Sequence, residues 1–174
     1  MDELNLSRNE LVFIAMANEY CHDIESALET ERAVFVSSML KILPRIYIAI
    51  SDVIDRTEDD DDMTYIDSYL AEGQYDYVRN RLYQLFGEYD TYLEVFEDDM
   101  KYSDTPIIST ISENLTDIYQ ELYNFVSSVQ DAPTELSKGY VMATKENFKS
   151  YWGQTLVNVI RALHCINYKD PISE

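Results

Sequence analysis

The sequence is poor in glycine, proline and cysteine, and these shortages exclude several kinds of protein. Four glycines and four prolines among 174 residues leave long stretches without a helix breaker. Two cysteines, Cys21 and Cys165, are too few for a disulfide scaffold and lack zinc-site spacing. The first residues are acidic and show no apolar signal segment. We therefore expect an all-α protein of the reducing cytoplasm.

Basic residues are also scarce: 13 Lys and Arg stand against 33 Asp and Glu, a net charge of −20. Such a surface repels phosphate and anionic lipid, so we expect neither direct nucleic-acid binding nor membrane binding. Residues 55–135 hold 21 acids and 4 bases, whereas residues 138–174 hold 5 bases and 3 acids. This imbalance predicts that the C-terminal segment docks against the acidic body, and that an external partner would be basic.

The stretch 105–129 predicts the helix around which the rest of the chain packs. Its apolar residues recur at steps of three and four, as in one stripe of an α-helix; they are Ile108, Ile111, Leu115, Ile118, Leu122, Phe125, Val126 and Val129. The helix could begin at Pro106 or at Thr110, which has capping-box spacing with Glu113. The opposite face is polar and is expected in water; it carries Ser112, Asn114, Asp117, Gln120, Glu121 and Asn124.

The remaining elements are predicted from the same helical period and from capping and breaking residues. The expected helices are 7–28 after a Ser7–Glu10 capping box, 33–54, a short 63–70, 74–86 stopped by Gly87, a short 92–100, and 135–166 bent at Gly153. Pro44 should kink the 33–54 helix, with a break as the alternative. Residues 33–50 are the nearest match to a membrane span, but Lys41, Pro44 and Arg45 interrupt them. We predict one domain, 1–174, that is an antiparallel bundle of about five to seven helices.

Two connections are expected between these helices, an acidic loop at about 55–64 and a longer connection at about 87–105. The run Asp55–Asp62 contains six carboxylates and no apolar residue, which favours a solvated loop. It lacks the register of an EF-hand calcium loop. Whether it binds a divalent cation is left open.

A metal site is one candidate chemistry. Glu19 and His22 form a Glu-x-x-His pair on a predicted helix, the spacing that di-iron bundles use twice. The other histidine, His164, follows Arg161 at that spacing, so the second pair is missing. We expect no metal or other cofactor; if one binds, Glu19 and His22 are the candidate ligands.

A partner-binding surface is the other candidate. Acids and aromatics are mixed without a clear period before residue 105. Tyr151 and Trp152 lie beside the predicted bend, and tyrosine and tryptophan are frequent at recognition surfaces. The candidate residues are Tyr92, Glu94, Glu97, Asp98, Asp99, Tyr102, Asp104, Tyr151 and Trp152. A single tryptophan in a helical protein is also commonly a core residue. No nucleophile, oxyanion donor or phosphate loop accompanies the carboxylates, so we expect no catalytic residue.

Several stretches together resemble a bacterial family catalogued as a domain of unknown function, number 5063. They are ANEYC (17–21), FVSSMLKILPRIYI (35–48), YLEVFEDDMKYSDTPI (92–107), TISENLTDIYQEL (110–122) and ENFKSYWGQTLVNVIRALH (146–164). The resemblance covers nearly the whole chain and implies a small, soluble, all-helical bacterial protein. It transfers no activity, cofactor, partner or catalytic residue. The family pattern does not require histidine after Glu-Tyr-Cys, which weakens His22 as a ligand.

The leading hypothesis is a non-enzymatic cytoplasmic module that binds another protein, since acids and 15 tyrosines are abundant and catalytic sets are absent. A second hypothesis is an acidic inhibitor, either an immunity-type protein or a nucleic-acid mimic, which requires carboxylates in a row on one face. A third is a carboxylate-metal protein built around Glu19 and His22. The partner and the oligomeric state do not follow from the sequence.

Overall fold

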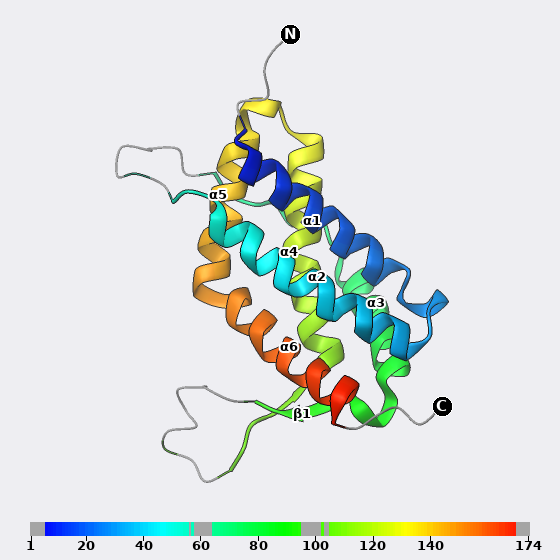
Figure 1. Ribbon diagram of the computed structural model, residues 1–174. Helices are drawn as coiled ribbons and strands as arrows, with labels where there is room; N and C mark the ends of the chain where they lie inside the picture. Colours follow the sequence, from blue (N-terminus) through cyan, green and yellow to red (C-terminus); the bar gives the residue numbers. More distant parts are fainter. Residues whose placement is uncertain (1–5, 56, 58–63, 95–101, 103–104, 170–174) are drawn as a thin grey trace.

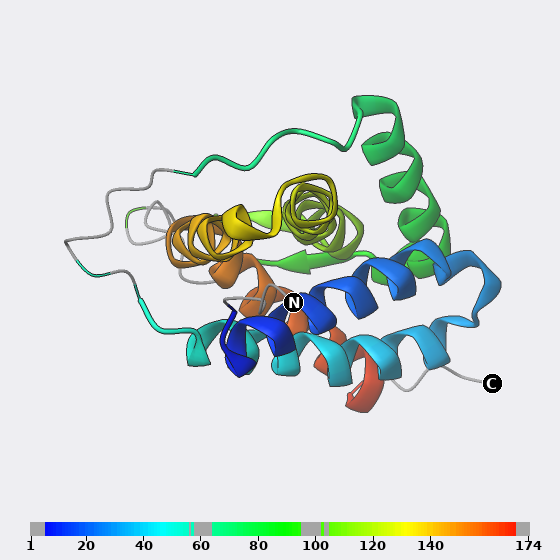
Figure 2. The ribbon, with the colours of Figure 1, turned by 90° about the horizontal axis from the view of Figure 1, so that it is seen from above.

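Helices make up most of the computed structural model, which describes residues 6–55, 57, 64–94, 102 and 105–169. The α-helices are α1 (Arg8–Glu25), α2 (Arg32–Asp52), α3 (Glu72–Phe86), α4 (Ile111–Asp131), α5 (Ser137–Asn147) and α6 (Gly153–Tyr168). The pair α1 and α2 lies obliquely across the pair α4 and α5 (Figures 1 and 2). The fold is therefore all-α apart from one small hairpin, and the predicted antiparallel bundle is confirmed.

Helix α4 contacts α1, α3, α5 and α6, so the predicted hub is confirmed (Figure 1). Leu115, Ile118, Leu122 and Phe125 on its apolar stripe are all fully buried. The helix begins after Thr110, whose hydroxyl accepts from the Glu113 amide at 3.4 Å. The alternative start at Pro106 is therefore wrong.

The other face of α4 is less exposed than its polar residues suggested. Ser112 is 3% exposed and Asn114 is 8% exposed, because a hairpin packs against the first turns of the helix. The hairpin's strands are β1 (Thr91–Leu93) and β2 (Ile108–Thr110), paired antiparallel with Leu93 opposite Ile108. The predicted helix over 92–100 is thus wrong at its start, and residues 95–100 lie outside the described residues.

The segment 64–70 is not helical, contrary to the short helix predicted at 63–70. The side-chain oxygen of Asn124 on α4 accepts from the amides of Tyr69 at 2.9 Å and Leu70 at 2.8 Å. These two amides are therefore held by a distant residue. Helix α3 follows and ends at Gly87. The φ of Gly87 is 56°, a backbone conformation that residues with a side chain rarely adopt.

Helix α2 runs without interruption across Pro44, so the alternative of a break is wrong. By length and composition α2 could cross a membrane, with a mean hydropathy of 1.6 over its most apolar window. Core helices of soluble proteins pass the same test. Here α2 packs against α1 and α6, and Phe35, Met39 and Ile46 are buried in the core.

The C-terminal helix is bent, as predicted, through a π-helical turn at Phe148–Trp152 between α5 and α6. Gly153 packs against the Phe148 backbone at the end of this turn, because a Cβ there would lie 2.5 Å from the Phe148 carbonyl oxygen.

The basic C-terminal segment docks on the acidic body, as predicted from the charges. The ammonium groups of Lys145 and Lys149 lie 3.1 and 2.6 Å from the Asp55 carboxylate. The buried Lys145 ammonium also donates to the Val53 carbonyl.

Candidate functional site

The predicted partner-binding residues that the structure describes do not form one surface. Trp152 is fully buried and packs edge-on against Phe148, so it cannot contact a partner. Glu94 is buried and accepts from the Asn158 amide. Tyr92 is half-buried, and its hydroxyl accepts from the Asn114 amide.

Two of the predicted partner-binding residues remain on the surface, Tyr102 and Tyr151, which are 92% and 51% exposed. Glu97, Asp98, Asp99 and Asp104 lie outside the described residues. The predicted metal ligands Glu19 and His22 are both exposed on α1. Within the described ranges, no three His, Cys, Asp or Glu side chains gather as a metal site would require.

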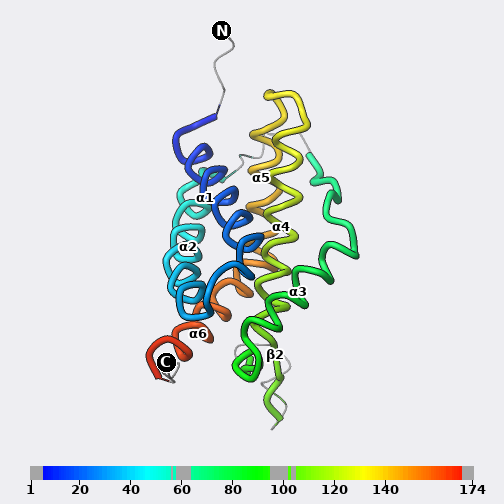
Figure 3. Tube along the Cα trace, turned by 90° about the vertical axis from the view of Figure 1, so that its right-hand side faces the viewer, coloured from blue at the N-terminus to red at the C-terminus, as the bar shows by residue number. Residues whose placement is uncertain are grey.

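A second candidate surface is an acidic face on α4. It consists of Glu113, Asp117 and Glu121, spaced one helical turn apart, together with the flanking Tyr75 and Tyr151. Helix α4 lies between α3 and α5 in Figure 2, and α3 crosses α4 in Figure 3. The Asp117 carboxylate accepts from the Tyr75 hydroxyl of α3 at 2.6 Å and from the Tyr151 hydroxyl of the π-turn at 3.1 Å. One carboxylate therefore orders a tyrosine on each side of it.

The charges of the acidic face are not neutralised by the part of the chain that the structure describes. None of its three carboxylates has an ion pair there. Like charges four residues apart destabilise a helix. Burial raises the pKa of Glu121, and burial with the neighbouring Asp117 raises the pKa of Tyr151 to about 12. The acidic face therefore concentrates negative charge, and the repulsion between its carboxylates lowers the stability of the fold.

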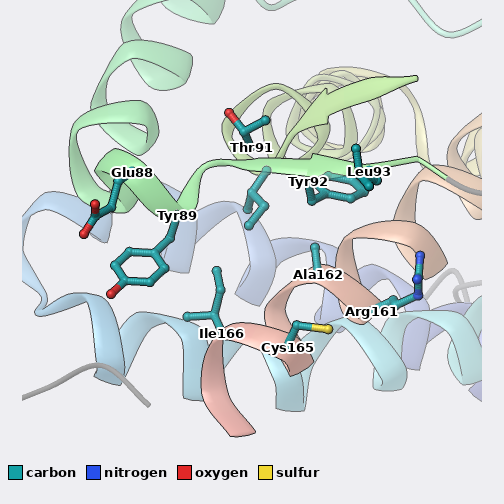
Figure 4. Close-up of a pocket in the computed structure, with 10 residues that line it drawn as sticks. Glu88, Tyr89, Thr91, Tyr92, Leu93, Arg161, Ala162, Cys165 and Ile166 are labelled. Carbon is teal, nitrogen blue, oxygen red and sulfur yellow. The ribbon is translucent and has the colours of Figure 1, made fainter. Parts of the chain in front are cut away.

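A groove of about 400 Å³ lies beside the first residue of α4, Ile111, between β1 and α6 (Figure 4). Tyr89, Leu93, Ala162 and Ile166 give it apolar walls. The groove lies within the size range typical of ligand sites. Arg161 supplies its cationic group, and the Leu93 end of β1 is the end near Arg161 in the figure.

Asp90 fixes the position of β1 relative to α4. It is 1% exposed, and its carboxylate accepts from both the amide and the hydroxyl of Ser112, each at 2.7 Å. Its carbonyl accepts from the Ile111 amide at 2.8 Å. The carboxylate thus satisfies a free amide in the first turn of α4, where the helix dipole favours negative charge.

A tyrosine pocket of about 250 Å³ lies between α1, α3 and α4. Tyr77, Tyr119 and Tyr123 line it, and the Tyr119 hydroxyl donates to Glu25 at 2.9 Å. Arg81 stacks over the Tyr77 ring at 5.1 Å, and its Nε is buried without a hydrogen-bond partner. This pocket adds to the tyrosine-rich character of the surface around α3.

The model of the family described as "Domain of unknown function (DUF5063)" matches residues 5–169. The chain belongs to this family. It is also similar to protein BF1032 from Bacteroides fragilis, known from a crystal structure, with 31% sequence identity and a TM-score of 0.81. The match covers 99% of this chain and 100% of that one. A comparison with curated proteins finds no match.

Membership of the DUF5063 family agrees with the resemblance found in the sequence, and it brings no assigned activity. Sequence reasoning missed three features of this DUF5063 member: the role of Asp117, the buried Asp90 and the groove beside Arg161. The spacing of Glu113, Asp117 and Glu121 was a readable signal for an acidic row. No local pattern signals the groove, because β1 and α6 are far apart in the chain.

Proposed function

We propose that the protein is a non-enzymatic cytoplasmic module that binds a basic segment of another protein through the acidic face. The carrying observation is the Asp117 carboxylate, which has a tyrosine hydroxyl on either side and no ion pair among the described residues. Carboxylates steer a basic partner, and tyrosine rings supply contact area at low entropic cost. A partner's arginine or lysine would supply the missing positive charge.

The row of carboxylates favours one second candidate, an acidic inhibitor of a basic toxin or nuclease. Glu113, Asp117 and Glu121 lie on one face at a rise of about 6 Å per step. In this version the basic partner is an enzyme, and the acidic face occupies the surface on which that enzyme holds nucleic acid. Inhibition of a captured nuclease or toxin would distinguish this version from simple binding.

The test is affinity capture from native cytosol with wild type and with the triple variant Glu113→Gln, Asp117→Asn and Glu121→Gln. We expect wild type to retain a specific basic protein and the triple variant to lose it. Raising the salt concentration should release the same protein, because exposed charges are screened. Identical capture by both proteins would contradict the proposal.

The matched control neutralises three exposed acids elsewhere, with Glu19→Gln, Asp52→Asn and Glu135→Gln. It changes the net charge by the same amount as the triple variant. It should therefore bind like wild type if the acidic face is the site. If the control loses the partner equally, binding depends on total charge, and the assignment to α4 fails.

A further inference from the structure

The strand β1 has one edge that β2 does not use. The bonded pairs of the hairpin include Asp90 with Ile111 and Glu94 with Ile107, where an amide donates to a carbonyl at 2.8 Å in each. In an antiparallel ladder bonded pairs alternate with non-bonded pairs. The amides and carbonyls of Thr91 and Leu93 therefore point away from β2.

The groove lies along this free edge. Thr91, Tyr92 and Leu93 all line it although their side chains alternate between faces, so the groove meets the backbone edge rather than one face of the sheet. In Figure 4 β1 lies between β2 and α6. The opposite wall is α6, with Ala162 and Ile166 facing the strand.

Arg161 gives the groove a polar end. Its side chain is exposed, and it has neither an ion pair nor a hydrogen bond to any described residue. It lies beyond the Leu93 end of the strand in Figure 4. A positive group in line with a strand edge suits a carboxylate that ends a chain better than an internal side chain, which would project from one face.

We propose that this groove binds the carboxyl-terminal tail of a partner protein as an added strand. The tail runs parallel to β1, bonds to the free amides and carbonyls of Thr91 and Leu93, and places one apolar side chain against Ala162 and Ile166. Its terminal carboxylate meets Arg161. Strand addition of this kind draws affinity from main-chain hydrogen bonds and specificity from side-chain pockets. The site is separate from the acidic face and does not depend on it.

The test is a library of hexapeptides with free carboxyl termini, screened against the full chain, beside the same library with amidated termini. We expect enrichment of one apolar position among the free-terminus peptides. Amidation should weaken the enriched peptides at least about tenfold, as should Arg161→Gln, since both remove a charge-assisted contact. Arg161→Lys should retain part of the affinity, and the exposed Arg45→Gln should have no effect.

A second variant tests the strand edge itself. Leu93→Pro removes the outward amide and leaves the bonds to β2 in place, because proline is tolerated on an edge strand. We expect it to fold, as shown by circular dichroism, and to lose peptide binding, while Leu93→Thr keeps binding at reduced affinity. No enriched peptide, equal binding of amidated peptides, or full binding by both Leu93→Pro and Arg161→Gln would overturn the proposal.

Discussion

Replacement of Asp90 by alanine should strongly destabilise the protein. The change removes a buried carboxylate that accepts two hydrogen bonds from Ser112, each at 2.7 Å. A hydrogen bond to a charged group contributes about 1.5–3 kcal/mol, and the two buried donors would be left without a partner. We expect a loss of about 3–5 kcal/mol in the free energy of unfolding, a large share of the total for a domain.

Graded variants separate the charge from the hydrogen bonds. Asp90→Asn keeps an acceptor for the Ser112 amide but loses the charge at the helix N-terminus, so we expect a cost of about 1–2 kcal/mol. Ser112→Ala removes only the hydroxyl and should cost a similar amount. The double variant Asp90→Ala with Ser112→Ala should cost less than the sum of the single changes, because they share one interaction.

Urea unfolding followed by circular dichroism measures these differences as shifts of the midpoint at constant slope. The exposed neighbour Glu88 provides the control, and Glu88→Ala should stay within about 0.5 kcal/mol of wild type. If Asp90→Ala also stays within about 0.5 kcal/mol of wild type, the carboxylate does not hold the hairpin to α4 as we infer.

Three further predictions follow from the docking of the C-terminal segment and from the tyrosines. Lys145→Met removes a buried ammonium and should cost about 1–3 kcal/mol in urea unfolding, whereas the more exposed Lys149→Met should cost under about 1 kcal/mol. Gly153→Ala should lower the melting temperature despite alanine's higher helix propensity, because the methyl group clashes with the π-turn; an unchanged melting temperature would contradict this packing. Burial raises the pKa of Tyr92 and of Tyr151 to about 12, so the folded state holds these protons above pH 10 while the unfolded state releases them. The contribution of these two tyrosines to stability should therefore be constant below pH 10 and be lost between about 10 and 12, as followed by phenolate absorbance and circular dichroism; phenolate formation complete before unfolding begins would contradict it.

The helices were predictable because their signals are local. The capping box of Ser7 and Glu10 forms as its spacing predicts, and the bend lies beside Gly153, as predicted. The stripe on α4 is long and regular enough to predict burial without knowledge of its neighbours.

The hairpin and the segment 64–70 were not predictable, because distant residues determine them. Strand β1 pairs with a strand that follows the intervening residues 94–107, and its three residues are too few to show a period of two. Residues 69 and 70 bond to Asn124, which is more than 50 positions away. The local sequence at either place therefore does not predict these bonds.

The candidate surfaces were likewise predictable from the sequence only in part. The acid spacing on α4 can be read from the sequence, whereas the placement of tyrosines from α3 and the π-turn beside Asp117 depends on packing. Trp152 is a core residue, which was the alternative given for a single tryptophan in a helical protein.

Helix α4 connects the two candidate surfaces, because it starts at the hairpin and carries the acidic face. Ser112, tied to the hairpin by Asp90, precedes Asp117 by five residues, or about 8 Å along the axis. A helix transmits position with little bending over so short a span. Two chains bound at the two ends of this span would therefore be held at a constant separation and orientation, as on a small scaffold.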